Sequence, residues 1–134
     1  MRSLLNLDDR QALLTRFRSL RPETPARWGR MDAPRMLVHL TDQMHHTLGD
    51  VTARPRPGPL RWPIIRQLVM YWLPWPKGRV KGPSEAFVEL IRRFVDREER
   101  MAWPDHALFG RMTKQIWGYF CHRHFGHHLR QFGA

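Results

Sequence analysis

Bulky apolar side chains recur every three or four residues in several segments of this chain, and most of its 11 prolines lie between those segments. A spacing of three to four residues places side chains on one face of an α-helix, whereas a half-buried strand requires strict alternation. Proline cannot donate the backbone hydrogen bond that continues a helix, so the prolines mark joints. No strand alternation and no internal repeat is visible. The pattern therefore predicts an all-α fold.

Capping residues and helix breakers set the expected bounds of the helices. Asp8 or Asp9 can cap the first helix, because a short polar side chain accepts a hydrogen bond from a free N–H group at a helix start. Asp32 and Ser84 suit the starts of two later helices for the same reason. Gly49 suits a helix end, because glycine readily adopts the left-handed backbone conformation. The expected helices cover residues 8–20, 32–48, about 60–73, 84–103 and 113–132.

These elements predict a single domain over residues 1–134, folded as a four-helix bundle with an extra helix in the crossover. A chain of 134 residues is long enough to bury a sizeable core. The extra helix belongs to the tryptophan-rich stretch from Leu60 to Trp75, which Arg61 and Arg66 interrupt. That stretch is shorter than the roughly 20 apolar residues that a membrane span needs. An ordinary core stripe explains it better than a contact with a membrane surface.

The net charge of +11 raises the question of a nucleic-acid partner. All but three of the 23 basic residues are arginines, and they are scattered along the chain rather than gathered in a block. This distribution, and the lack of a zinc-finger or RNP motif, argue against specific nucleic-acid binding. Binding to nucleic acid or to another anionic surface is kept as an alternative. The single cysteine excludes an intramolecular disulfide and, with no secretory signal visible, favours the cytoplasm.

The segment from Cys121 to Phe132 holds four of the eight histidines of the chain. His124 and His128 stand four residues apart, so a helix places both rings on one face. Trp117 and other bulky residues share that face, which points both imidazoles toward the interior. A polar group buried without a partner is costly, and a bound metal ion would remove that cost.

Two imidazoles on one helix supply only part of a metal site, so a third ligand has to come from another helix. His39 is the best candidate, because it lies at the edge of the core stripe of the second helix. Cys121 shares the stripe of His124 and His128, but a single buried cysteine more often fills space than binds metal. The polar residues that could replace a ligand or orient an imidazole are Asp42, Gln43, His46, Cys121 and His127.

The expected site fits several divalent metals. Zinc, nickel and iron all accept imidazole, so the sequence does not choose among them. Three neutral ligands leave the ion its full charge, and such an ion lowers the pKa of a bound water or thiol. No His-Glu-x-x-His motif is present, so the zinc-protease interpretation lacks its catalytic glutamate.

Several motifs resemble the DinB-like superfamily, which is named for a DNA-damage-inducible protein. Trp28-Gly-Arg-Met31 and Ala33-Pro-Arg-Met-Leu-Val-His39-Leu resemble the start of its second helix. Four later motifs resemble one branch of the superfamily: His106-Ala-Leu-Phe-Gly110, Met112-Thr113, Trp117-Gly118 and the final block His124-Phe-Gly-His-His128-Leu-Arg-Gln-Phe-Gly133. The resemblance extends from about residue 28 to residue 133, and the final block is its most specific part.

The resemblance implies a bundle of DinB-like type, commonly a homodimer, with a divalent metal on three histidines. By motif position the ligands fall on His39, His124 and His128. Some superfamily members are transferases or isomerases that use a low-molecular-weight thiol, which the metal is thought to activate. The leading hypothesis is therefore a metal-binding protein acting on a small molecule, as a thiol-dependent transferase or a hydrolase. The alternative is a non-enzymatic dimeric bundle, so the sequence leaves open whether the protein is an enzyme.

Overall fold

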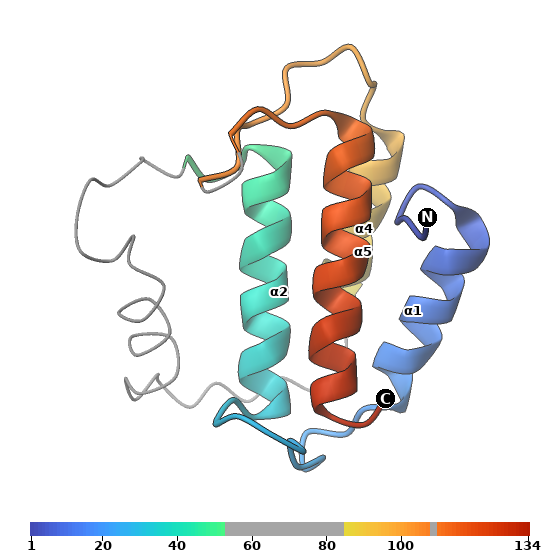
Figure 1. Cartoon of the computed structure of the whole chain (residues 1–134), viewed down its shortest axis with the longest axis vertical. Helices are drawn as coiled ribbons and strands as arrows, with labels where there is room; N and C mark the ends of the chain where they lie inside the picture. The colour runs from blue at the N-terminus through green and yellow to red at the C-terminus, as the bar shows by residue number, and fades with distance from the viewer. Residues whose placement is uncertain (53–84, 108–109) are drawn as a thin grey trace.

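The computed structural model of the chain describes residues 1–52, 85–107 and 110–134 (Figure 1). The described residues form four helices and no strand, with one isolated bridge between His106 and Gly110. The helices are α1 (Leu7–Ser19), α2 (Ala33–Leu48), α4 (Glu85–Asp96) and α5 (Lys114–Gln131). The all-α prediction is confirmed for this part of the chain. The extra helix expected over residues 60–73 and the cap expected at residue 84 lie outside the described residues.

The two helices that carry the candidate ligands begin and end close to where the sequence predicts. Asp32 caps α2, its carboxylate accepting from the backbone N–H of Arg35 at 2.8 Å. Gly49 ends α2 with a φ of 76°, the left-handed conformation that glycine tolerates without strain. Thr113 caps α5 by accepting from the N–H of Ile116. Local capping interactions thus fix the starts of the two helices that carry the candidate ligands.

The predicted cap of α1 is wrong. Asn6, not Asp8 or Asp9, caps this helix, and its side chain accepts from the backbone N–H of Asp9 at 3.0 Å. Asp9 instead accepts from the N–H of Ser3, which folds the N-terminal residues back onto the first turn. Both aspartates remain in that turn, where a carboxylate interacts favourably with the helix dipole.

The predicted end of α4 is also wrong, because the helix stops at Asp96 rather than near Trp103. The ammonium of Lys114 donates to the carbonyls of Val95 and Arg97 at 2.7 and 2.6 Å, which satisfies acceptors that helix continuation would otherwise use. The guanidinium of Arg97 donates to the carbonyl of Leu48 at the end of α2. These contacts with other helices draw the chain away from the helical path.

The helices pack side by side, and their main contacts join α1 to α5, α5 to α2, and α2 to α4 (Figure 1). α2 and α5 run in opposite directions next to one another, and α4 packs against α2. α1 runs in the same direction as α5. Leu4, just before α1, donates its N–H to the carbonyl of Gly118, and Arg16 near the end of α1 binds the carbonyl of Ala134. The antiparallel pair of α2 and α5 brings the middle of one helix to the second half of the other.

Aromatic rings from three helices make the centre of the core. Phe17 on α1 and Phe87 on α4 lie 5.3 Å apart between ring centroids, and Phe125 on α5 lies 5.5 Å from Phe87. All three rings are fully buried. Edge-on and tilted aromatic contacts of this kind add to the stability that burial provides.

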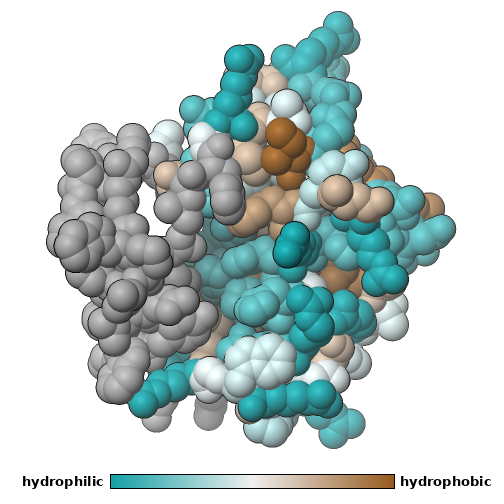
Figure 2. Space-filling model, viewed as in Figure 1, coloured by the Kyte–Doolittle hydropathy of each residue, from teal (hydrophilic) through white to brown (hydrophobic). Residues whose placement is uncertain are grey.

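The described part of the surface is mainly hydrophilic on the face shown in Figure 2. Some large hydrophobic side chains of the helices also reach solvent, among them Val38 on α2 and Tyr119 on α5. Scattered exposed residues of this kind are ordinary on a folded protein. Among the described residues, no helix combines the length and apolarity that crossing a membrane requires.

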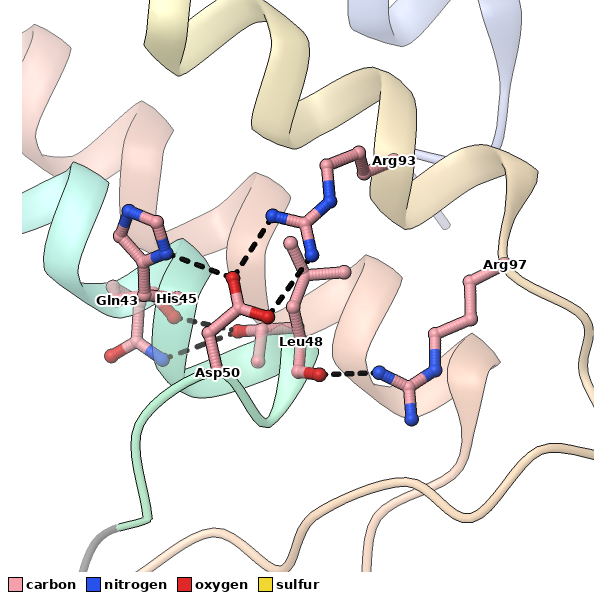
Figure 3. Close-up of polar contacts among 7 residues, drawn as sticks. Gln43, His45, Leu48, Asp50, Arg93 and Arg97 are labelled. Atoms are coloured by element: carbon pink, nitrogen blue, oxygen red, sulfur yellow. Dashed lines mark hydrogen bonds and ion pairs between the residues drawn. The ribbon is translucent and has the colours of Figure 1, made fainter.

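An ion pair ties the end of α2 to α4 (Figure 3). Both carboxylate oxygens of Asp50 accept from the Arg93 guanidinium at 3.0 Å, and His45 lies 2.9 Å from one of them. The hydrogen bond with Arg93, helped by that with His45, lowers the pKa of Asp50 from 3.8 to about 2. The pair therefore stabilises the fold fully above pH 4, and this contribution is lost as the pH falls through about 2.

We expect Asp50→Asn to lower the free energy of unfolding at pH 7 by about 1 kcal/mol or less, because Arg93 is partly exposed and solvent screens the pair. The difference from the native protein should shrink steadily between about pH 4 and pH 2. Urea unfolding over this pH range measures it, with Asp42→Asn on the exposed face of α2 as the control. A difference that does not change with pH would contradict the assigned role of Asp50.

Candidate metal centre

Three histidine rings from two helices meet between α2 and α5. The Nε2 atoms of His39 and His124 lie 3.0 Å apart. The ring centroid of His128 lies 5.1 Å from that of His39 and 4.8 Å from that of His124. His124 and His128 share a face of α5 because they are four residues apart, and the antiparallel packing sets His39 opposite them. The structure brings together the three residues that the sequence selected.

The three rings are close enough to hold one metal ion. One ring nitrogen from each histidine lies within 4.8 Å of those of the other two, and this is the only such group of three among the residues in the described ranges. Two nitrogens bound to a tetrahedral zinc at 2.0–2.1 Å lie about 3.3–3.4 Å apart, so the widest pair has to close by no more than about 1.5 Å. Small rotations of the imidazoles would supply that change.

The three rings differ in burial. His128 is almost fully buried, with 4% of its surface exposed, while His39 and His124 are half-buried. Burial lowers the pKa of His128, against an opposing effect of its hydrogen bond with Gln131. The neutral form that a metal ligand requires is therefore favoured at this position near pH 7.

Two successive hydrogen bonds link the His128 ring to the backbone through the Gln131 side chain. Nδ1 of His128 lies 3.1 Å from Oε1 of Gln131, and Nε2 of Gln131 donates to the carbonyl of Trp28 at 2.9 Å. The sequence analysis did not select Gln131. Its position three residues after His128 on one helix face could have indicated a contact between the two side chains. Its other partner, Trp28, is 103 residues away along the chain, so the sequence does not indicate that contact.

Aromatic rings pack against the ring of His124. The ring of Phe120, one turn earlier on α5, stacks on His124 with centroids 5.5 Å apart and planes inclined by 17°. His106 contacts Phe120 edge-on at 4.8 Å and also contacts Trp117. Packed rings on one side limit the rotation of His124, so its nitrogen stays directed toward the other two histidines.

Cys121, one of the alternative ligands, lies deeper in the core. Its thiol is fully buried and hydrogen bonded to the hydroxyl of Thr47 at 3.5 Å. Burial raises the pKa of Cys121 to about 12, so the thiolate that binds metal is scarce at neutral pH. The thiol thus fills space in the core, the role that the sequence favoured over metal binding.

The remaining candidates lie on the same two helices and are exposed or half-buried. Gln43 is half-buried and donates to the hydroxyl of Thr47 at 3.4 Å. His127 is exposed, and its ring lies 5.3 Å from that of His128. His46 is half-buried and Asp42 is exposed. None of these four belongs to the group of three close ring nitrogens in the described part of the chain.

No protein-family model, no curated protein and no solved structure matches this chain. The likeness to the DinB-like superfamily therefore stays a prediction that rests on residue motifs. The geometry of the three histidines stands independently of it.

Proposed function

We propose that this chain is a divalent-metal-binding protein of DinB-like type, with His39, His124 and His128 as the protein ligands. One observation carries the proposal. Three imidazoles from segments 85 residues apart direct nitrogens to a common point, where one pair already lies 3.0 Å apart. Imidazole nitrogens are common ligands of zinc, nickel and iron, and three of them form the usual protein share of a catalytic zinc site.

The donor set suits a centre that keeps one position for an exchangeable ligand. His39 and His124 are half-buried, so solvent reaches that side of the cluster. When bound, such an ion would lower the pKa of a water or a low-molecular-weight thiol in that position. The chain's own share is to hold three neutral rings in place, with Phe120 behind one and Gln131 behind another.

The proposed chemistry is therefore that of a thiol-dependent transferase or a metal-dependent hydrolase acting on a small molecule. The deeply buried, protonated thiol of Cys121 leaves the thiol of such a reaction to come from solution. The homodimer that the resemblance implies stays a prediction.

Metal titration of protein first freed of metal tests the proposal directly. Zinc, nickel and ferrous iron are added separately, the last without oxygen, and binding is followed by calorimetry and elemental analysis. We expect one ion per chain for at least one of these metals. Protein that takes up none of the three would overturn the proposal.

A further inference from the structure

We propose that Gln131 is a positioning residue that fixes which nitrogen of His128 is free to bind a metal ion. The inference rests on the proposed metal site. Gln131 is the last residue of α5, and only 2% of its surface is exposed. Its amide joins Nδ1 of His128 to the carbonyl of Trp28.

The chemistry of these three partners allows one arrangement of protons. The carbonyl of Trp28 can only accept, so the amide nitrogen of Gln131 has to face it. The amide oxygen of Gln131 then faces Nδ1 of His128, and this oxygen also only accepts. Nδ1 must therefore carry the proton. In a neutral ring the lone pair then lies on Nε2, which is the atom left to bind metal.

The backbone around residue 28 holds the amide in this orientation. The N–H of Arg27 donates to the main-chain carbonyl of Gln131 at 2.7 Å. Gly29 has a φ of +80°, and a Cβ built on it would fall well inside van der Waals contact of the Gln131 amide nitrogen. Glycine at this position thus lets the amide approach the backbone. The affinity of the site for metal should consequently depend on the segment between α1 and α2.

Long-range ¹H–¹⁵N NMR of the metal-free protein, at a pH where the ring is neutral, tests the proton assignment itself. We expect His128 to be protonated at Nδ1 in the native protein and to become a mixture of tautomers in Gln131→Met. Gln11→Met, at an exposed position of α1, is the matched control and should leave the tautomer unchanged. A proton on Nε2 of His128 in the native protein would overturn the inference.

Zinc affinity tests the consequence. Loss of an outer partner of a metal-binding histidine typically weakens binding by about 10- to 100-fold, and we expect a loss of this size in Gln131→Met. Gln131→Glu in its protonated form keeps both contacts, an oxygen that accepts from Nδ1–H and a hydroxyl that donates to the carbonyl of Trp28, so it should recover most of the lost affinity. Affinity of Gln131→Met equal to that of the native protein would contradict the role.

Gly29→Ala reaches the same amide without altering α5, so it decides the case if Gln131→Met does not fold. We expect it to weaken zinc binding and to disturb the His128 tautomer. The control is Gly49→Ala, which introduces the same kind of backbone strain at a φ of +76° but meets only the ring of Pro104 at 4.0 Å. Equal zinc affinity in the two variants would count against the inference.

The two measurements separate this inference from the proposed function. The expected tautomer without any metal uptake would overturn the metal site alone. Metal uptake with the proton on Nε2 of His128 would overturn the role of Gln131 alone.

Discussion

Replacing His39 with alanine is expected to lower the affinity for zinc, nickel or iron by about 100-fold or more. Structural zinc sites with four ligands bind with roughly 10–16 kcal/mol, so each ligand accounts for about 3 kcal/mol. His39 is the most informative of the three histidines to remove. It lies on the other helix from its two partners and is half-buried, so its loss costs little packing.

His46→Ala is the matched control, because this residue also lies on α2, is half-buried and was the alternative third ligand. It should bind metal as the native protein does. Calorimetric titration of both variants with the same metal gives the comparison. Loss of binding in His46→Ala but not in His39→Ala would show that the ligand set is wrong.

The same variants should differ in thermal stability when metal is present. A ligand at 100 times its dissociation constant stabilises the folded state by about 2.7 kcal/mol, or on the order of 10 °C for a domain of this size. Excess zinc should therefore raise the Tm of the native protein and of His46→Ala, but hardly that of His39→Ala. Without metal, all three should melt within a few degrees of one another.

Replacing Phe87 with alanine is expected to destabilise the fold by about 3–5 kcal/mol, the usual cost of emptying a buried aromatic position. Phe87 is fully buried and contacts the rings of Phe17 and Phe125, so its side chain joins α4 to α1 and α5. Domains of this kind are stable by only about 5–15 kcal/mol, so the loss is a large share of the total. Urea unfolding, monitored by circular dichroism, measures it.

Tyr119→Ala is the control for this change, since Tyr119 is an aromatic residue of α5 that is 39% exposed. Its removal should cost less than about 1 kcal/mol. A loss in Phe87→Ala no larger than that in Tyr119→Ala would mean that the three rings do not form the centre of the core.

Local chemistry made most of the helical frame predictable. Asp32 and Gly49 act on neighbouring backbone groups, so the sequence alone determines where α2 begins and ends. The end of α4 was not predictable in this way. It depends on Lys114, whose ammonium reaches the carbonyls of Val95 and Arg97 from the start of another helix. The charged residues after Asp96 are compatible with a helix, and only these tertiary contacts decide otherwise.

The candidate site was likewise predictable where it depends on local spacing and not where it depends on tertiary contacts. The pairing of His124 with His128 follows from helical spacing, and the edge position of His39 made it the best third residue. Gln131 and the stacking of Phe120 on His124 were missed. The orientation of Gln131 depends on the carbonyl of Trp28, a backbone group that no residue pattern reveals before the chain is folded.

The separation of 85 residues between His39 and His124 also sets when the proposed centre can be filled during synthesis. A ribosome releases α2 long before α5, so a nascent chain first presents only one of the three proposed ligands. The remaining two rings arrive together on α5, after the other described helices have already emerged. The proposed centre therefore cannot form before α5 has emerged and packed against α2, whatever metal the growing chain meets earlier.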